Sequence, residues 1–150
     1  MSQPKKETAL RNKLKKLFKS MSNAGSSVHL TWVESHATSL GVPDLNYCVD
    51  GVEGWLELKA GPHIDIRASQ VIWMKEHIAS GGWPLFFISW GNMFLIVPGD
   101  RGVDLRQNPC LENVIRLSSS FWTGEIPMND FLLRIKRPAK EYKKVMEVFD

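Results

Sequence analysis

The sequence predicts a single α/β domain in which helices flank a central mixed β-sheet. Its 150 residues are enough for one domain with a buried core, and its apolar fraction of 43% is typical of a globular chain. Short apolar runs also alternate with segments of helical periodicity. We expect a basic N-terminal helix and loop at 1–27, a core at 28–98 and a C-terminal extension with a basic helix at 99–150.

The first elements are a helix and a strand. Large apolar residues recur at helical spacing over 6–20, with lysines opposite them, which predicts an amphipathic helix. Residues 28–35 alternate imperfectly between apolar and polar and favour a strand. The following Gly41-Val42-Pro43 interrupts regular structure, because proline fixes its own backbone and restrains the residue before it.

A β-hairpin is predicted around Asp50-Gly51, between strands at 44–50 and 52–60. A two-residue type I′ turn needs positive φ at both central positions, and Asp-Gly satisfies this need. With these two residues in the turn, Asp44 lies opposite Glu57 on the neighbouring strand. Directly opposed residues share one face of a sheet, with Cβ atoms about 5 Å apart.

Three side chains that could bind a metal or take part in catalysis are therefore expected on one face of this hairpin. Lys59 joins Asp44 and Glu57 there, because side chains alternate with a period of two. Two opposed carboxylates destabilise a sheet unless a cation lies between them, and Mg²⁺ binds one or two carboxylates while keeping waters for phosphate. The plainer alternatives are that Glu-x-Lys marks a charged strand face and that Pro-Asp opens a turn. The aligned register favours a metal-binding active site.

A second helix and a second hairpin follow. Residues 67–80 carry an apolar stripe at helical spacing and end at Gly81-Gly82. Two runs at 85–90 and 93–97 flank Gly91-Asn92, another hairpin signal. Both runs are apolar on both faces, so they are expected at the centre of the sheet, under helices.

The remainder of the chain is predicted to be less regular. Residues 99–127 have the composition of loops, with a short strand expected at 113–117. A final helix is expected over 139–149, after Pro138.

Gly41-Val42-Pro43-Asp44, thirteen residues before Glu57-Leu58-Lys59, resembles the signature of the PD-(D/E)XK nuclease superfamily. Together with the small size, these motifs and Gln70 more narrowly resemble the virus-type replication-repair nucleases, phage enzymes akin to Holliday-junction resolvases. The resemblance covers about residues 30–98. It implies a restriction-endonuclease-like fold and a divalent-metal-dependent endonuclease acting on branched DNA, working as a homodimer in a bacterial or phage-infected cell.

The resemblance also implies roles for individual residues. Asp44, Glu57 and the backbone carbonyl of Leu58 would bind Mg²⁺, with Mn²⁺ able to substitute, and Lys59 would assist the attacking water. An acid on the first helix often completes the metal site in such families, which makes Glu7 a candidate and Glu34 its rival. Gln70 would belong to the catalytic set, although a glutamine at a helix start more often faces solvent.

Charge is distributed unevenly along the chain. Residues 1–19 contain seven basic residues and one acidic residue, and 134–150 contain six basic and three acidic residues, whereas the middle is acidic. Basic ends around an acidic centre suit a metal site presented to DNA, because lysine and arginine neutralise phosphates. The candidate DNA contacts are Lys13, Lys15, Lys16, Lys136, Arg137 and Lys140. The alternative is that these lysines only solvate two helices.

Other functions remain open at this level. Trp73 and Trp83 are candidates for stacking on bases, or else core residues. A non-catalytic DNA-binding module would explain the basic ends but not the acids, and an end-processing or restriction-type nuclease would keep the chemistry. A glycosidase could use two close carboxylates, but it would not need the lysine.

Two cysteines far apart in sequence show no zinc spacing, which predicts free thiols and an intracellular setting. We expect neither membrane insertion nor a nucleotide cofactor.

Overall fold

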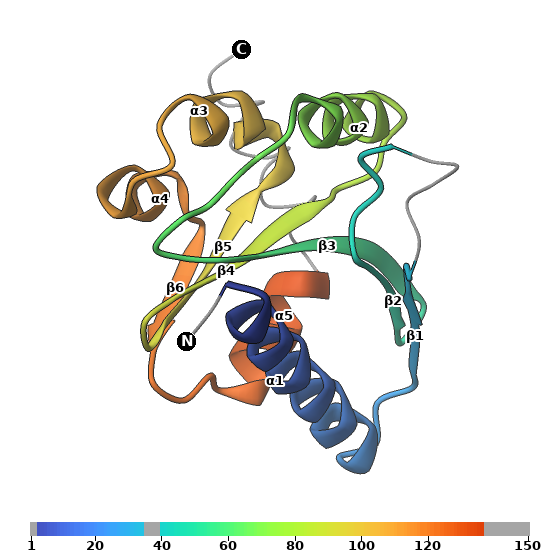
Figure 1. Ribbon diagram of the computed structural model, residues 1–150. Helices are drawn as coiled ribbons and strands as arrows, with labels where there is room; N and C mark the ends of the chain where they lie inside the picture. Colours follow the sequence, from blue (N-terminus) through green and yellow to red (C-terminus); the bar gives the residue numbers. More distant parts are fainter. Residues whose placement is uncertain (1–2, 35–39, 137–150) are drawn as a thin grey trace, which may run out of the picture.

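The fold is built on one mixed six-stranded β-sheet, shown in Figure 1. The computed structural model describes residues 3–34 and 40–136. The strands follow one another across the sheet in sequence order: β1 (Val28–Trp32), β2 (Leu45–Val49), β3 (Val52–Ala60), β4 (Leu85–Trp90), β5 (Met93–Pro98) and β6 (Ser120–Thr123). Only β3 and β4 are parallel. The mixed sheet that the sequence predicts is confirmed.

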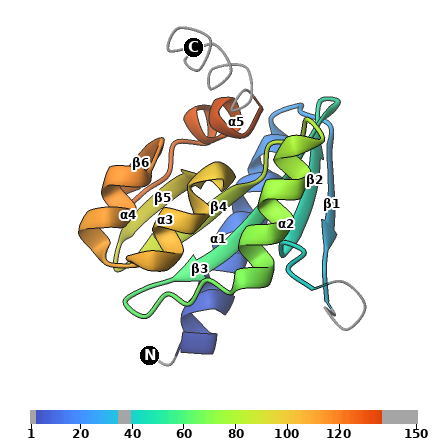
Figure 2. The ribbon, with the colours of Figure 1, turned by 90° about the horizontal axis from the view of Figure 1, so that it is seen from above.

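Helices cover both faces of this sheet (Figures 1 and 2). One face carries α1 (Gln3–Asn23) and α5 (Met128–Lys136), and the other carries α2 (Ala68–Ala79), α3 (Gly102–Gln107) and α4 (Leu111–Leu117). A short 3₁₀ turn, η1 (Gly99–Arg101), leads into α3. Helix α2 connects β3 to its parallel neighbour β4, as a crossover between parallel strands requires. The flanking helices expected from the sequence are therefore present.

Helix α1 buries the apolar stripe that its sequence predicts. Leu10, Leu14 and Phe18, spaced by four residues, are almost fully buried in the core beneath the sheet. The helix is longer at both ends than the predicted 6–20. None of the helices in the described part of the chain has the length and apolar character needed to cross a membrane.

The hairpin around Asp50-Gly51 has the predicted register. Val49 pairs with Val52 and Leu45 pairs with Leu56, and the two turn residues have φ of 49° and 83°, as a type I′ turn requires. The turn is held from outside, because the Asp50 carboxylate accepts hydrogen bonds from the Ser27 amide (2.8 Å) and from Lys136 Nζ (3.0 Å).

The second predicted hairpin is also present. Trp90 pairs with Met93 across Gly91-Asn92, and most residues of β4 and β5 are buried. This burial on both faces explains why neither strand alternates between apolar and polar residues.

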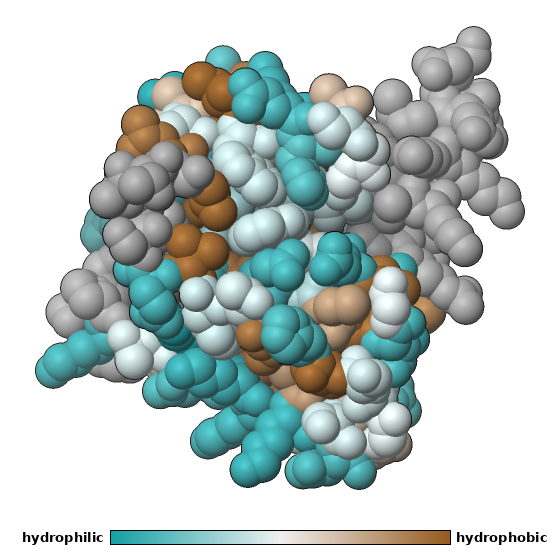
Figure 3. Space-filling model, turned by 90° about the vertical axis from the view of Figure 1, so that its right-hand side faces the viewer, coloured by the Kyte–Doolittle hydropathy of each residue, from teal (hydrophilic) through white to brown (hydrophobic). Residues whose placement is uncertain are grey.

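One edge of the sheet is formed by β1, whose His29 and Thr31 are exposed. Figure 3 views the molecule from this side, and hydrophilic residues gather over its lower half while apolar residues occur in small groups. Polar residues on an edge strand oppose pairing with another chain. Cys48 and Cys110 are free thiols.

The prediction for 99–127 is partly wrong. The strand expected at 113–117 is instead helix α4, and α3 and β6 were not expected at all. Val114 and Leu117 are buried while Ile115 is more exposed, a helical spacing that the β-branched pair Val-Ile concealed. The buried Asn113 also anchors this helix by donating to the carbonyl of Asn108 at 2.7 Å.

Residues 99–136 contribute to the core of the domain. Phe131 and Ile135 of α5, a helix missed by sequence reasoning, pack into the same cluster as α1. Leu105 and Val114 complete the core on the other face. The helix predicted over 139–149 lies outside the described residues.

Candidate metal and catalytic site

The candidate site lies where β2 and β3 separate. The last pair between these strands is Leu45–Leu56, whereas β3 continues to Ala60, paired with β4. Asp44 lies at this fork, one residue before β2. Its Oδ2 accepts a hydrogen bond from the backbone amide of Leu58 at 2.8 Å. The Asp44 side chain thus takes the place of a strand partner and lies beside the peptide that follows Glu57.

Glu57 is buried on the face of the sheet covered by α2. The residue is 4% exposed. Its Oε1 accepts a hydrogen bond from Gln70 Nε2 at 3.1 Å and lies 3.8 Å from Lys59 Nζ. Its Oε2 has no hydrogen-bond partner among the described residues. One carboxylate oxygen of Glu57 is therefore held by a protein donor, whereas the other accepts no hydrogen bond from the described residues.

The environment strongly disfavours a negative charge on Glu57. Burial and then the charge of Asp44 raise the pKa of Glu57 to about 9, a hydrogen bond of the protonated form to Asp44 adds to the rise, and Lys59 opposes it. In the absence of a cation, Glu57 therefore holds a proton at neutral pH. A divalent ion between the two acids would replace that proton and favour the ionised form.

Gln70 has two roles at the start of α2. It is 2% exposed, so a solvent-facing side chain is excluded. Its Oε1 accepts a hydrogen bond from the Arg67 amide at 3.0 Å, which satisfies a free N–H at the helix start, while its Nε2 donates to Glu57. Gln70 thus links the geometry of the helix start to the orientation of the candidate ligand.

Glu7 and Glu34, the two candidates for completing the metal site, lie in different surroundings. Glu7 lines a cleft of about 270 Å³ together with Asp44 and Leu58. The Glu34 side chain is 72% exposed and pairs with Arg11 at 2.6 Å. Glu7 therefore lines the cleft with Asp44, whereas Glu34 is paired with Arg11 of that cleft.

Arg11 is a residue of this cleft that sequence reasoning missed. It lines the same space as Glu7 and Asp44, and its guanidinium lies 4.3 Å from the centroid of the Trp32 ring. Its spacing of four residues from Glu7 on a helix was the available signal, because such residues share a face.

The donor set fits a hard divalent cation with few protein ligands. In the described ranges, no three acidic, histidine or cysteine side chains are grouped closely enough to hold a metal by themselves. Asp44 and Glu57 supply two carboxylates, and the strand alternation directs the Leu58 carbonyl toward the β2 side, where its amide meets Asp44. Mg²⁺ is commonly bound by one or two carboxylates and several waters. The orphaned Oε2 of Glu57 is the observation that such an ion would explain.

The loop that carries Asp44 is fixed by a close approach of Gly41 to α2. Gly41 has φ of 82°, and a Cβ at this position would lie 2.1 Å from the carbonyl oxygen of Ser69. We expect Gly41→Ala to lower the free energy of unfolding by about 2 kcal/mol or more, from backbone strain and steric overlap. Urea denaturation measures this loss. Gly25→Ala is the matched control, because Gly25 also has positive φ but no atom within 4 Å. Equal losses in both variants would contradict a specific contact with α2.

The predicted DNA-contacting residues are dispersed. Lys13, Lys15 and Lys16 lie on α1, and Lys15 Nζ is 5.6 Å from the Trp32 ring centroid. Lys136 pairs with Asp50 at the hairpin turn. Asp50 lies six residue steps along the strand from Asp44, a distance of about 20 Å. Arg137 and Lys140 lie outside the described residues.

The tryptophans proposed for base stacking have partners within the protein. Trp73 stacks on His77 (ring centroids 4.6 Å apart) and meets Trp55 edge-on at 5.3 Å. Trp83 packs against the core of the α1 face.

Comparisons with known proteins do not assign the chain to a family. No protein-family model matches the chain, and a search of curated proteins finds no significant match. What the protein does must therefore be inferred from its own residues.

Proposed function

We propose that this protein is a divalent-metal-dependent DNA endonuclease of the PD-(D/E)XK kind. The observation that carries the proposal is the convergence of Asp44 and Glu57 at the fork between β2 and β3, with Lys59 Nζ 3.8 Å from Glu57. A divalent cation would account for this set, because it would pair with the buried Glu57 oxygen that has no protein donor and would offset the repulsion between Glu57 and Asp44.

Each residue has a distinct part in the proposed chemistry. Asp44, Glu57 and the Leu58 carbonyl would hold Mg²⁺ or Mn²⁺, which when bound supplies Lewis-acid activation for hydrolysis of a phosphodiester. Lys59 is positioned to orient the attacking water and to stabilise negative charge on the phosphate. Gln70 fixes the Glu57 carboxylate, and Glu7 and Arg11 line the adjoining cleft, where Arg11 offers a guanidinium for a phosphate oxygen.

We extend the proposal to branched DNA and to a homodimer, on the resemblance of the motifs to resolvase-like nucleases. Two symmetric nicks in a four-way junction need two active sites, and a two-fold dimer supplies them. If native mass measurement showed only a monomer bound to junction DNA, the resolvase-like homodimer would be contradicted, whereas the nuclease proposal would be unaffected.

The test is a cleavage panel of linear, flapped and four-way DNA in Mg²⁺, Mn²⁺ and EDTA. We expect cleavage in either metal, none in EDTA, and the highest rate on branched substrates. Binding of DNA without cleavage in either metal would refute the nuclease and favour a non-catalytic DNA-binding module. Faster cleavage of linear ends would indicate an end-processing enzyme.

A further inference from the structure

Three basic residues form a stripe along one flank of α1, and this stripe begins at the metal cleft. Arg11, Lys15 and Lys19, which we call the basic stripe, follow Glu7 at intervals of four residues. Residues four apart on a helix lie one above the other on nearly the same face, and each interval advances about 6 Å along the helix axis. Glu7 is the only acidic residue in the sequence of this helix. The charge on this flank therefore changes from negative beside Asp44 to positive along the stripe.

The Trp32 ring of β1 shows in which direction the first two basic groups point. The Arg11 guanidinium lies 4.3 Å from the centroid of this ring and Lys15 Nζ lies 5.6 Å from it. Both distances are within the range of a cation–π contact. Arg11 and Trp32 also line the cleft that contains Asp44. Both cations are therefore held on the β1 side of α1, at the edge of the metal cleft.

The basic stripe is available to an anion. Lys15 and Lys19 are exposed, and neither forms an ion pair within the described part of the chain. Arg11 already holds one oxyanion, because its Nη2 lies 2.6 Å from a carboxylate oxygen of the exposed Glu34. A phosphate oxygen can accept the same kind of hydrogen bond from a guanidinium. Figure 3 faces β1 and shows hydrophilic residues over the lower half of the molecule, the level at which α1 lies in Figure 1.

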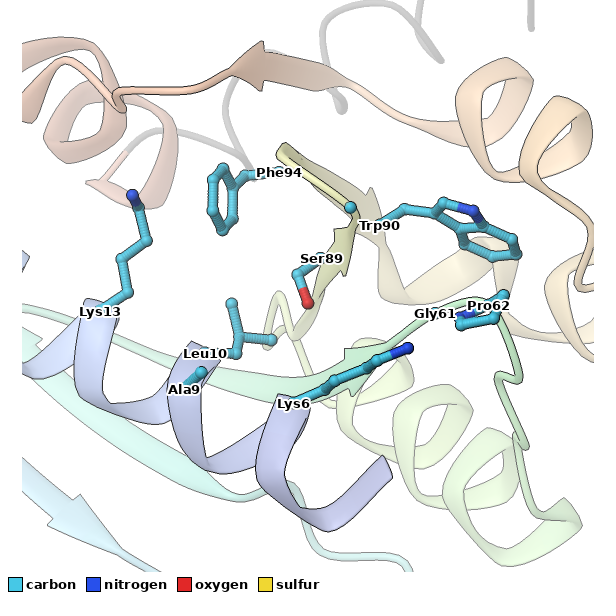
Figure 4. A pocket seen from close by; sticks show the side chains of 10 residues that line it. Lys6, Ala9, Leu10, Lys13, Gly61, Pro62, Ser89, Trp90 and Phe94 are labelled. Atoms are coloured by element: carbon cyan, nitrogen blue, oxygen red, sulfur yellow. The ribbon is translucent and has the colours of Figure 1, made fainter. Parts of the chain in front are cut away.

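Two other lysines of α1 lie on its opposite flank. Figure 4 shows Lys6 and Lys13 beside a cavity of about 500 Å³ whose wall includes Phe94. Lys13 Nζ lies 4.4 Å from the centroid of the Phe94 ring. Neither lysine lines the cleft with Asp44. A DNA strand that passes through the metal cleft would therefore meet the basic stripe rather than these two lysines.

We propose that the basic stripe binds the phosphate backbone of the strand that is cleaved, so that this strand leaves the metal cleft along the β1 side of α1. The inference rests on the proposed function in that Glu7 and Asp44 mark the position of the scissile phosphate. Arg11 and Lys19 are about 12 Å apart along the helix axis, the axial length of about three to four nucleotides of one strand. Phosphate contacts position DNA without reading its sequence. The stripe would therefore fix where the strand lies, not which sequence is cut.

The test measures DNA binding without cleavage. Fluorescence anisotropy of a short labelled DNA duplex is recorded with the full chain in EDTA, over a range of salt concentrations. Arg11→Gln, Lys15→Gln and Lys19→Gln should each reduce the slope of log affinity against log salt by about 0.9, as expected for one phosphate contact to duplex DNA. Lys13→Gln is the matched control, because Lys13 also lies over an aromatic ring but on the opposite flank, and it should leave the slope unchanged.

A second comparison tests whether Arg11 itself contacts a phosphate. Glu34→Gln removes the carboxylate that pairs with Arg11, so that DNA no longer competes with it. The affinity for the duplex should rise by about two- to fivefold, the range expected for an exposed ion pair. In the Arg11→Gln background, the same substitution should leave the affinity nearly unchanged. An equal rise in both backgrounds would contradict a phosphate contact by Arg11, because it would show that Glu34 only repels DNA at a distance.

The outcomes separate this inference from the nuclease proposal. An unchanged slope in the three stripe variants, or an equal reduction in Lys13→Gln, would overturn the stripe as the path of the strand whether or not the cleavage panel shows activity. Lys15 and Lys19 are exposed, so their variants keep this test valid even if Arg11→Gln is unstable. A reduction confined to the stripe variants would support the stripe as a DNA contact even if no DNA were cleaved, in which case only the nuclease proposal fails.

Discussion

Asp44→Ala, Glu57→Ala and Lys59→Ala are each expected to reduce Mg²⁺-dependent DNA cleavage by at least about 100-fold. The first two variants each remove a carboxylate that would hold the metal ion. The third removes the Lys59 ammonium group, 3.8 Å from Glu57, which would stabilise negative charge on the phosphate. Initial cleavage rates on the preferred substrate, at saturating Mg²⁺, give the measurement. Circular dichroism of each variant should match that of the unmodified protein.

Glu34 supplies a control for these variants, and Glu7 supplies a test for an additional metal ligand. Glu34→Ala removes an exposed carboxylate that pairs with Arg11, and we expect cleavage to stay within about threefold, because surface pairs contribute little. Glu7→Ala removes the acid that shares the cleft with Asp44, and a loss near that of Asp44→Ala would identify Glu7 as a ligand. Undiminished cleavage in all three variants at Asp44, Glu57 and Lys59 would end the nuclease proposal.

Glu57→Gln is expected to make the metal-free protein more stable at neutral and alkaline pH. The folded-state pKa of Glu57 is raised from 4.5 to about 9. Its contribution to stability is therefore fully present below pH 4.5 and is lost as pH rises through 9, whereas glutamine does not titrate. At pH 7 the difference has an upper limit of about 3 kcal/mol, from 1.4 kcal/mol per pH unit. Urea denaturation in EDTA at pH 5, 7 and 9 should show the variant's advantage growing with pH.

Glu57→Gln also tests whether the folded protein binds Mg²⁺ at this site. Mg²⁺ should raise the denaturation midpoint of the unmodified protein, because a ligand that binds only the folded state stabilises it, and it should leave Glu57→Gln nearly unchanged. Glu53→Gln is the matched control, because Glu53 is an exposed acid on the same strand, and it should behave like the unmodified protein. A pH-independent difference between Glu57→Gln and the unmodified protein would contradict the charged state assigned to this group.

Much of the candidate site followed from local rules. A two-residue turn at Asp50-Gly51 was enough to predict how β2 pairs with β3, and the structure has this register from Val49–Val52 to Leu45–Leu56. The predicted pairing of Asp44 with Glu57 is absent, because Asp44 lies one residue before β2 and its carboxylate binds the Leu58 amide instead. By contrast, the helix at Leu111–Leu117 was predicted as a strand. Its short run of β-branched residues is compatible with either element, and burial against β5 decides between them.

By itself, the sequence determined the α/β class, the register of the first hairpin and the placing of Glu57 and Lys59 on one face of β3, because turn chemistry and side-chain alternation act between near neighbours. Only the tertiary structure decided that Gln70 is buried against Glu57, and that Glu7 lines the cleft with Asp44 while Glu34 pairs with Arg11. These contacts join distant segments of the chain. They depend on how α1 and α2 pack on opposite faces of the sheet, which no local pattern specifies.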